Sequence, residues 1–547
     1  MNGTDTTSTR VVVVGNGMVG ARFAADLAAR DTAGACEITV LGAEEYEPYN
    51  RVLLSDVVAG RTDVAALTLP AADDARVSIR LGTEALAIDR AARRVVTADG
   101  TYPYDVVVLA TGAAARVPDV AGLTDRPGGL PRGAHALRTL DDAREIVAAS
   151  VNARHAVVVG AGVLGLEVAC GLARRGVAVS VVHGGDSLMD RQLATAAGRV
   201  VESRLAGLGV RAWTRAVTER VEVDAHGRVR GVVLREADRL VELDADLVVL
   251  ACGTVPETGL ARAAGLTVDR GVVVGDDLAS PDDPCVLAVG DCAQPPEGGT
   301  GLVAQGWDQS RRLAAALAER AAGVAPSTGA GPDGDGPVRA AGGTDVVRLK
   351  ASGLDVVAMG VCGTRRPPDP AHRTVTLSDP VAGRHVEVVV ADGLLVGATC
   401  VGAPDVGADL TAAYTRRVPV PSDPAQLLLR AVAAAPAPAS TPTRMPDRTT
   451  VCTCNGVTKG EVVACWHDGA RSVDDVARAT RATTGCGGCR EVVCGLVDWL
   501  AAADPGAAAA GPPLADDGRV VVGDVGPGPE RARTAGERRL TRTTPPG

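Results

Sequence analysis

Four cysteines toward the C-terminal end of the chain are spaced like the ligands of a metal centre. Cys452 and Cys454 form one pair, and Cys486 and Cys489 form a second pair after 31 intervening residues. Four thiolates that converge can hold either a zinc ion or an iron–sulfur cluster. The spacing alone leaves both kinds of site open.

Two glycine-rich turns carry the residues that dinucleotide binding requires. Both have the spacing Gly-x-Gly-x-x-Gly, the first at Gly15, Gly17 and Gly20 and the second at Gly160, Gly162 and Gly165. In such a turn the missing side chains let the backbone approach a pyrophosphate, and the following helix N-terminus supplies partial positive charge. Two complete turns predict two nucleotide sites.

Polar residues at the ends of other predicted strands support the first of these sites. Glu44, with Glu45 as the alternative, follows a strand expected over 38–41, where an acidic group can hold ribose hydroxyls. Thr111 and the pair Gly290-Asp291 each follow a further apolar strand. The carboxylate of Asp291 is placed to bond a sugar-like chain. Together these residues predict a flavin site.

The elements that must position these residues follow from the apolar pattern. Residues 10–30 and 156–175 each read as a buried strand, a glycine turn and a helix, which is the start of a nucleotide-binding unit. Residues of the flavin site occur on both sides of the second unit, so one unit is nested in the other. Segment 346–430 alternates apolar and polar positions and predicts a small α/β domain. The expected fold class is α/β, with two nested Rossmann-like domains, a small α/β domain and a small helical cluster domain.

The domain limits follow from shifts in composition. Gly, Pro, Ala and Asp dominate before residue 345, and an Ala/Pro/Ser/Thr stretch precedes the cysteine segment, so we expect a flexible connection and a linker there. The predicted parts are 1–150 (flavin-binding domain, first part), 151–270 (second nucleotide-binding domain), 271–322 (flavin-binding domain, second part), 323–345 (flexible connection), 346–432 (small α/β domain), 433–449 (linker), 450–503 (cluster domain) and 504–547 (disordered tail).

Length and charge exclude several function classes. The 547 residues suffice for about three or four domains. The net charge is −10, with both signs spread along the chain, so no basic stripe for nucleic acid is present. The first ten residues have no basic signal region, and glycines break the apolar run that follows. We therefore expect a cytoplasmic protein with neither a nucleic-acid nor a membrane partner, whose oligomeric state is open.

The motifs together resemble those of flavoprotein reductases with two dinucleotide domains. Within these, the chain looks most like the N-terminal half of the NAD(P)H-dependent assimilatory nitrite reductase large subunit and the electron-transfer subunits of assimilatory nitrate reductase. The motifs are Gly15-Asn-Gly-Met-Val-Gly20, Tyr49-Asn-Arg-Val-Leu-Leu-Ser55, Ala110-Thr-Gly112, Gly160-Ala-Gly-Val-Leu-Gly-Leu-Glu167 and Gly290-Asp291. The resemblance implies FAD bound by Gly15, Gly17, Gly20, Glu44, Arg51, Thr111 and Asp291, with Arg51 close to the pyrophosphate.

The resemblance also assigns the second turn to the nicotinamide nucleotide. Glu167 lies in the family's position near the nicotinamide end and is the candidate catalytic residue; the alternative is an ordinary acid in the first helical turn. His183 stands where NADH-preferring relatives usually have an acidic residue, so NADPH is admissible and the choice of nucleotide stays open. Ser55 stands where disulfide or peroxidatic relatives would have a reactive cysteine, which argues against thiol chemistry.

Residues 450–503 resemble the [2Fe–2S] domain of the bacterioferritin-associated ferredoxin type. The resemblance implies a cluster held by Cys452, Cys454, Cys486 and Cys489, with structural zinc as the alternative. Thr458 with Glu461, and Ser472 with Asp475, have the spacing of helix capping boxes. Cys465 and Cys494 fall outside the ligand pattern, and we expect them to be core residues.

The implied function is electron transfer from NAD(P)H through FAD and [2Fe–2S] to a separate nitrite or nitrate reductase catalytic subunit. No second cysteine quartet for a sirohaem and [4Fe–4S] half is found in the sequence. Three alternatives remain at this stage: a reductase of rubredoxin or another small carrier, a subunit of an amine or amino-acid dehydrogenase, and a redox sensor or cluster-assembly protein without turnover.

Overall fold

The computed structural model describes residues 8–70, 72, 74–124, 129–323, 345–351, 353–364, 366, 368–428, 445–452, 455–485 and 487–503. Most of the predicted connection (324–344), most of the predicted linker (433–444) and the predicted disordered tail (504–547) lie outside the described residues. So do Cys454 and Cys486. Residues 1–500 form one unit of the chain, which contains every sheet found among the described residues.

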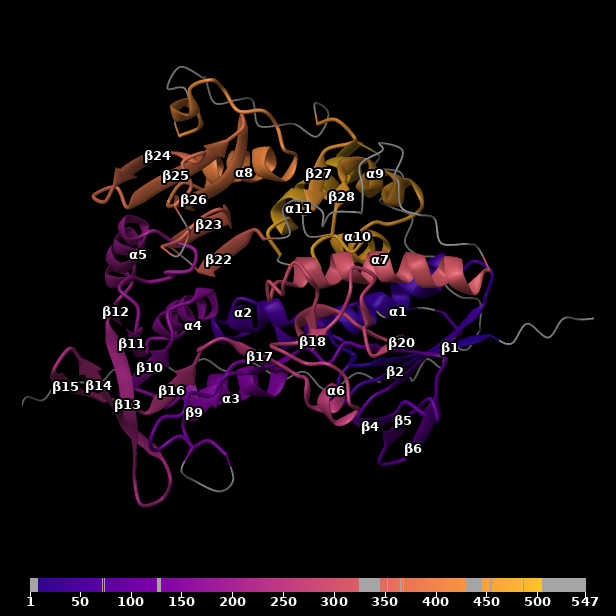
Figure 1. Cartoon of the computed structure of the whole chain (residues 1–547). Helices are drawn as coiled ribbons and strands as arrows, with labels where there is room; N and C mark the ends of the chain where they lie inside the picture. Colours follow the sequence, from indigo (N-terminus) through magenta and orange to yellow (C-terminus); the bar gives the residue numbers. More distant parts are fainter. Residues whose placement is uncertain are drawn as a thin grey trace, which may run out of the picture. The chain divides into compact units, whose positions relative to one another are not determined.

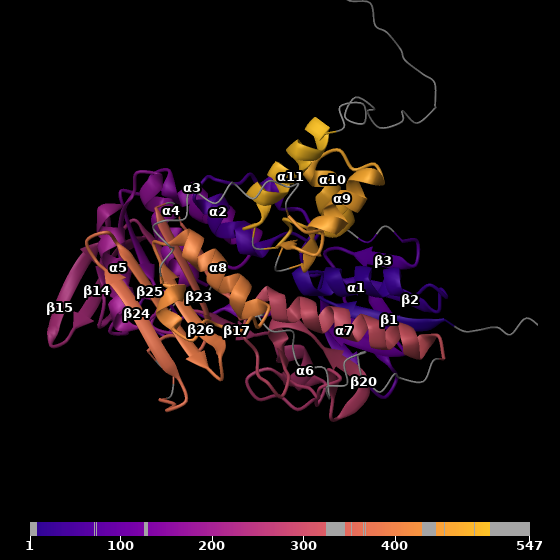
Figure 2. The same ribbon diagram turned by 90° about the horizontal axis from the view of Figure 1, so that it is seen from above.

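The first sheet has six strands in the order β19-β20-β7-β1-β2-β3. Its members are β1 (Thr9–Val14), β2 (Cys36–Leu41), β3 (Val77–Arg80), β7 (Val106–Leu109), β19 (Ala279–Ser280) and β20 (Asp283–Ala288). All neighbours except β19 and β20 pair in parallel. Val11 to Val14 are buried, as expected for a central strand of a parallel sheet. Helices α1 (Met18–Arg30) and α7 (Val303–Ala321) pack side by side and share a core with this sheet (Figure 2).

The second sheet has five parallel strands in the order β12-β11-β10-β16-β9. Its strands and helices are β9 (Ala134–Ala136), α3 (Leu140–Ser150), β10 (His155–Val159), α4 (Val163–Arg174), β11 (Ala178–Val182), α5 (Thr195–Gly207), β12 (Val210–Trp213) and β16 (Leu247–Leu250). The chain enters this sheet after β7 and returns to the first sheet at β19, which confirms the nested arrangement. Strand β9 precedes residue 150, so the second sheet takes one strand from the segment that we assigned to the first domain.

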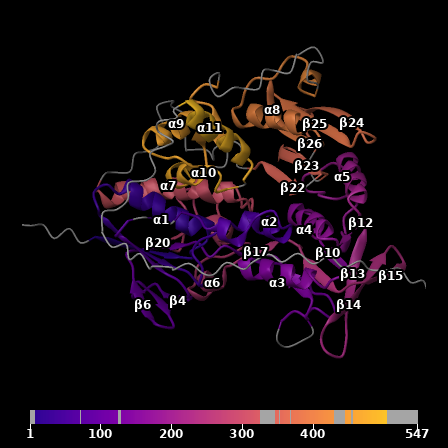
Figure 3. The same cartoon turned by 180° about the vertical axis from the view of Figure 1, so that it is seen from behind.

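Short elements connect and extend the two large sheets. Helix α2 (Leu54–Val58) packs against both α3 and α4 (Figure 3). Strands β8 (Ala113–Ala115) and β17 (Thr254–Pro256) pair where the chain passes between the sheets. The remaining elements are η1 (Arg51–Leu53), η2 (Val64–Leu67), β4 (Ala85–Asp89), β5 (Arg94–Thr97), β6 (Gly100–Pro103), β13 (Ala216–Val223), β14 (Val229–Glu236), β15 (Arg239–Asp244), α6 (Gly259–Ala263), β18 (Val272–Val273), η3 (Gly290–Cys292) and β21 (Ala293–Gln294).

The small α/β domain predicted from residue 346 onward has an antiparallel sheet in the order β22-β23-β26-β25-β24. Its elements are β22 (Val347–Ala351), β23 (Leu354–Gly360), β24 (Arg373–Asp379), β25 (Arg384–Ala391), β26 (Leu394–Val401), α8 (Pro404–Thr415) and η4 (Pro424–Leu427). Helix α8 packs on β23 and β26 over an apolar core. Strand β22 contacts α4 of the second sheet.

The cysteine-bearing segment is a short hairpin followed by three helices (Figure 1). Its elements are β27 (Thr450–Cys452), β28 (Val457–Thr458), α9 (Lys459–His467), α10 (Val473–Thr480) and α11 (Arg490–Ala503). Thr458 with Glu461 and Ser472 with Asp475 form reciprocal capping boxes at the starts of α9 and α10, as predicted. In the described part of the chain, no helix is both long enough and apolar enough to cross a membrane.

Candidate functional site

A cavity of about 1480 Å³ lies at the carboxyl ends of the first sheet's parallel strands. Ligands of doubly wound sheets bind at this edge. Of the predicted site residues, the cavity is lined by Gly15, Gly17, Glu44, Arg51, Thr111, Glu167, Gly290 and Asp291. The other predicted nucleotide-binding residues, Gly20, Gly160, Gly162, Gly165 and His183, do not line it.

The first glycine turn has the shape of a pyrophosphate cradle. A Cβ on Gly15 would lie 2.3 Å from the Ala110 carbonyl oxygen, and one on Gly20 would lie 2.0 Å from the Gly15 oxygen, so neither position accepts a side chain. A Cβ on Gly17 would meet nothing within 4 Å, which leaves open space in front of the helix α1 N-terminus. The buried amide of Asn16, between them, has no hydrogen-bond partner for either polar atom among the described residues. Open space beside unsatisfied polar atoms fits the diphosphate of FAD.

Glu44 and Arg51 lie together in the cavity wall. The Tyr49 hydroxyl donates a 2.7 Å hydrogen bond to Glu44 Oε2, and the Arg51 guanidinium pairs with the other carboxylate oxygen. The guanidinium also lies over the Tyr49 ring, 4.8 Å from its centre. Burial raises the pKa of Tyr49, so its hydroxyl stays protonated and keeps donating. Glu44 is thus held in a fixed position, which is what an acceptor for ribose hydroxyls needs.

Asp291 has a partner that the sequence did not reveal. Arg138 donates a 2.8 Å hydrogen bond to Asp291 Oδ2 and a 2.7 Å hydrogen bond from Nε to the Ala113 carbonyl oxygen. Thr111, across the cavity edge, donates its hydroxyl proton to the Glu257 carbonyl oxygen at 2.7 Å. Arg138 and Glu257 both line the cavity, so Arg138 adds a second arginine to the predicted lining residue Arg51.

Glu167 reaches the cavity from the second nucleotide unit. It lies in the second turn of α4, whose first turn has no acidic residue, and is only 6% exposed, so the alternative of an ordinary first-turn helix acid is wrong. Ser55 on α2 donates a 2.6 Å hydrogen bond to Glu167 Oε2. Val163 and Leu164 of the same helix line the cavity beside it. The start of α4 therefore forms the wall between the two nucleotide units.

The second glycine turn repeats the geometry of the first. A Cβ on Gly160 would lie 2.3 Å from the Ala251 oxygen, one on Gly165 would lie 2.0 Å from the Gly160 oxygen, and one on Gly162 would meet nothing within 4 Å. These residues fit a second dinucleotide, as the sequence predicts.

The carboxylate of Asp190 lies near the end of β11, although the residue that directly follows this strand is His183. The His183 Nε2 atom lies 3.6 Å from Asp190 Oδ1. Both side chains are largely buried. Asp190 lies in the loop that follows β11, so an acidic side chain borders the end of this strand. In dinucleotide-binding folds an acidic group at this strand end holds the adenosine ribose.

The two described ligand candidates are buried and accept hydrogen bonds. The Thr483 backbone N–H lies 3.2 Å from the Cys489 sulfur, and the Asn455 amide nitrogen lies 3.7 Å from the Cys452 sulfur. N–H groups aimed at sulfur suit the thiolates of an iron–sulfur cluster. No group of three or more metal-ligating side chains occurs in the part of the chain that the structure describes, from which two of the four predicted ligands are missing.

Cys465 and Cys494 lie on α9 and α11 of the same segment. Burial raises the pKa of the Cys465 thiol, so it stays protonated, as a core thiol does. Two other residues of the segment, Thr450 and Gly456, line the large cavity. The cysteine segment therefore borders the predicted flavin site.

Comparison with known proteins identifies two family matches. Residues 9–316, more than half of the chain, match the family "Pyridine nucleotide-disulphide oxidoreductase". Residues 450–499 match the family "BFD-like [2Fe-2S] binding domain". The first match implies FAD and NAD(P)H as cofactors and the second implies a [2Fe–2S] cluster, in agreement with the cofactors predicted from the sequence.

Individual relatives agree with the resemblance seen in the sequence. The nitrite reductase [NAD(P)H] of Bacillus subtilis is 31% identical over 88% of this chain and 57% of its own length. The assimilatory nitrate reductase electron transfer subunit of the same organism is 29% identical over 90% of this chain and 60% of its own length. The chain thus spans little more than half of these relatives.

A solved structure gives the same fold. The reductase of the covalent putidaredoxin reductase–putidaredoxin complex superposes with a TM-score of 0.63 at 25% identity, over 77% of this chain and 95% of the other. The fold, the glycine turns and the sequence match agree, and this chain belongs to the pyridine nucleotide-disulphide oxidoreductase family.

Proposed function

We propose that this chain takes electrons from NAD(P)H and passes them, by way of FAD and a [2Fe–2S] cluster, to a separate nitrite or nitrate reductase catalytic subunit. The observation that carries the proposal is one cavity lined by three parts of the chain. These are the first glycine turn, the start of α4 with Glu167, and Thr450 and Gly456 of the cysteine segment. The first glycine turn, the start of the helix that follows the second glycine turn, and the cysteine segment thus border one cavity.

When bound, FAD accepts a hydride and gives up electrons singly, and a [2Fe–2S] cluster accepts one electron at a time. The backbone at Gly15 and Gly17 and the N-terminus of α1 bind the flavin diphosphate, with Arg51 supplying positive charge beside it. Glu44 accepts from the ribose hydroxyls. Asp291, held by Arg138, accepts from the polyol part of the ligand.

The second glycine turn orients the nicotinamide nucleotide toward this cavity. Gly160, Gly162 and Gly165 bind its diphosphate, and Glu167 lies at the cavity wall where the nicotinamide end must approach the flavin. The Ser55 hydroxyl fixes the Glu167 carboxylate, so that this group holds the nicotinamide in one orientation. Val163 and Leu164 make the cavity wall beside Glu167 apolar.

The names of the relatives favour the acceptor in the proposal. A nitrite reductase and an electron transfer subunit of nitrate reductase match over 88% and 90% of this chain. Rubredoxin or another small electron carrier is the second candidate, since the solved reductase of similar fold is joined to putidaredoxin.

Anaerobic titration of the purified holoprotein with NADH and with NADPH tests the proposal. We expect one nucleotide to bleach the flavin bands and then the iron–sulfur bands, and iron and acid-labile sulfide to be present where a zinc site would have neither. Flavin that neither nucleotide bleaches would remove the reductase function in favour of an amine dehydrogenase subunit or a sensor. The reduced protein is then mixed with a nitrite or nitrate reductase catalytic subunit and, in parallel, with a ferredoxin or rubredoxin. The protein that reoxidises the cluster is the acceptor.

A further inference from the structure

Asn50 ties the cysteine segment to the flavin cavity. Its side-chain amide, only 2% exposed, donates to the carbonyl oxygens of Thr484 and Gly485 at 2.7 Å each. These two residues belong to the loop 481–485, called the cluster loop below, which directly precedes the predicted ligand Cys486. The residue after Asn50 is Arg51, which lines the flavin cavity. Two adjacent residues therefore contact the two sites: Asn50 binds the cluster loop, and Arg51 lines the flavin cavity.

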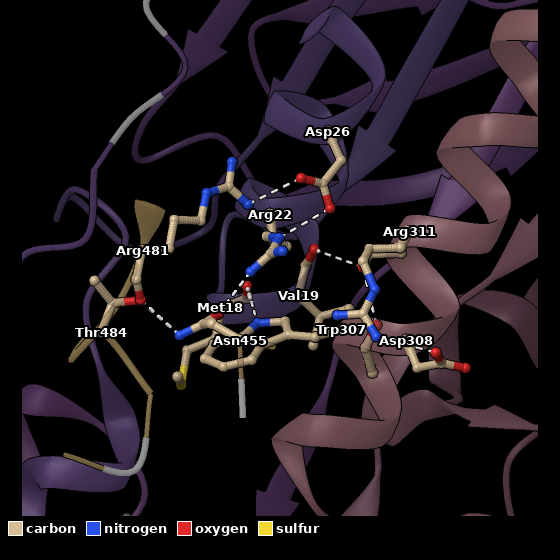
Figure 4. Close-up of polar contacts among 12 residues, drawn as sticks. Met18, Val19, Arg22, Asp26, Trp307, Asp308, Arg311, Asn455, Arg481 and Thr484 are labelled. Atoms are coloured by element: carbon tan, nitrogen blue, oxygen red, sulfur yellow. Dashed lines mark hydrogen bonds and ion pairs between the residues drawn. The ribbon is translucent and has the colours of Figure 1, made fainter. Parts of the chain in front are cut away.

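A second set of contacts joins α1 to the same segment (Figure 4). The two carboxylate oxygens of Asp26 form ion pairs with two arginines. Arg22 Nε lies 2.9 Å from Oδ2, and Arg481 lies 3.0 Å from Oδ1. Arg22 also donates to the Asn455 side-chain oxygen at 2.8 Å, and its guanidinium lies over the Trp307 ring, 5.5 Å from the ring centre. Two arginines from different parts of the chain therefore share one carboxylate.

Asn455 connects these ion pairs to the predicted ligand Cys452. Its amide nitrogen donates to the Arg481 carbonyl oxygen at 2.6 Å and lies 3.7 Å from the Cys452 sulfur. Thr484, whose carbonyl oxygen accepts from Asn50, donates its hydroxyl proton to the same Arg481 carbonyl at 2.8 Å. The contacts from η1 and from α1 thus converge on the turn that follows α10.

The charged groups of this interface are largely removed from water. The side chains of Arg22, Asp26 and Arg481 are 11%, 14% and 23% exposed. Burial, and then repulsion from Arg22, lower the pKa of Arg481, while Asp26 opposes the shift. Buried charges are tolerated only with good geometry and satisfied partners, so they favour one arrangement over others of similar area. The network therefore specifies how the segment sits on α1.

We propose that η1 and α1 form a docking site for the chain's own cluster segment, residues 450–503, and that Asn50 is the positioning residue that holds the cluster loop at the wall of the flavin cavity. The inference rests on the proposed function. The step that depends on this position moves one electron between two redox groups. Two such transfers carry the electron pair of one NAD(P)H, which becomes NAD(P)⁺ while one proton goes to solvent.

Asn50→Ser tests the positioning role in the full-length holoprotein. Serine keeps an oxygen for the N-cap of η1, which Asn50 now provides to the Val52 N–H, but is too short to reach the loop. We expect the flavin to be reduced by NAD(P)H at the wild-type rate in anaerobic stopped flow, and the cluster to be reduced roughly tenfold more slowly. Hydrogen exchange of the amides at 481–485 should become faster.

Asp63→Ser is the matched control, because Asp63 caps η2 in the same way through the Ala65 N–H and is not part of the docking site. It should change neither the cluster phase nor the exchange of 481–485. Wild-type values for Asn50→Ser in both measurements would overturn the docking site.

Asp26→Asn examines the second contact without changing side-chain size. It leaves Arg22 and Arg481 facing each other without the carboxylate between them, so we expect faster exchange at 481–485 and slower reduction of the cluster. Asp141→Asn is the control, since Asp141 pairs with Arg144 at an exposed position. Unchanged exchange in Asp26→Asn would contradict the inference.

The two proposals fail in different ways. A wild-type flavin that NAD(P)H does not reduce would end the proposed function, while hydrogen exchange would still report on docking. A wild-type protein in which both groups are reduced, but whose Asn50→Ser and Asp26→Asn variants behave normally in both measurements, would end the docking inference alone.

Discussion

Ser55 on α2 donates a 2.6 Å hydrogen bond to Glu167 on α4, and both side chains are buried. The bond joins α2, which directly follows η1, to α4, the helix that follows the second glycine turn. A serine hydroxyl makes this hydrogen bond better than a cysteine thiol would, because S–H is a weak donor. Ser55 therefore positions the Glu167 carboxylate, and it supplies no thiol for redox chemistry.

Ser55→Ala should weaken both the fold and the transfer step. Losing a hydrogen bond to a buried carboxylate costs about 1–3 kcal/mol of the free energy of unfolding. Reorientation of Glu167 should slow flavin reduction by NAD(P)H roughly tenfold or more. Stopped flow on FAD-loaded protein measures the rate.

Ser150→Ala is the matched control for that variant, because the Ser150 hydroxyl is also buried and bonds to the Val147 carbonyl oxygen at 2.7 Å. It should lower stability while leaving the rate of flavin reduction at its wild-type value. Equal rates in Ser55→Ala and wild type would show that Glu167 needs no support from Ser55.

The parts of the site that local spacing encodes could be predicted from the sequence. The glycine turns, the capping box at Thr458 and the acidic residue after β2 depend on neighbours a few positions away. Arg138 and its partner Asp291 are 153 positions apart, and Asn50 and Gly485 are 435 apart, so only the packed chain reveals these pairs. Strand β9 has three residues, too few to show periodicity, and its place in the second sheet was missed for that reason.

Glu44→Gln should weaken FAD binding, whereas Glu45→Gln should not. Glu44 lines the cavity and is held by Tyr49 and Arg51, while Glu45 is exposed. Losing the charged acceptor should raise the dissociation constant of FAD by roughly tenfold to a hundredfold. The increase in flavin fluorescence as FAD dissociates on dilution measures this constant. Similar constants for the two variants would reassign the ribose contact.

Asp190 should make the protein prefer NADH. Its carboxylate lies beside His183 at the end of β11, where it would repel a 2′-phosphate. Asp190→Ser should therefore lower KM for NADPH roughly tenfold relative to KM for NADH. Asp186→Ser, an exposed position in the same loop, makes the same change in net charge and should leave the ratio as it is. A shift of the same size in both variants would point to net charge instead.

His385 should make the small α/β domain less stable in mild acid. Burial lowers the pKa of His385 below its ordinary value of 6.5, and Glu387 only partly opposes this shift. The buried Nε2 has no partner among the described residues, so a proton there would lack an acceptor. Below about pH 6.5 the unfolded chain therefore binds the proton first, and stability falls as pH falls toward the folded-state pKa.

The thermal midpoint measured between about pH 7.5 and pH 5.5 checks this sign, since that range brackets the ordinary histidine pKa. The His385 Nδ1 atom lies 3.1 Å from the Ser378 hydroxyl oxygen. His385→Asn keeps a polar partner for this hydroxyl and should reduce the pH dependence of the midpoint. His226→Asn, at an exposed turn, should retain it. An unchanged slope in His385→Asn would assign the acid sensitivity to other groups.

Cys489→Ser and Cys494→Ser should differ in cluster content. Cys489 is buried and accepts from the Thr483 N–H, as a ligand thiolate would, whereas Cys494 lies further along α11 outside the ligand spacing. We expect Cys489→Ser to lose the visible iron–sulfur bands and most of its iron and sulfide, because a serine oxygen is a harder ligand than thiolate. Cys494→Ser should keep all three at the wild-type level while both variants retain FAD. Loss of iron from Cys494→Ser with retention in Cys489→Ser would move the fourth ligand to α11 and require a different fold of the cluster loop.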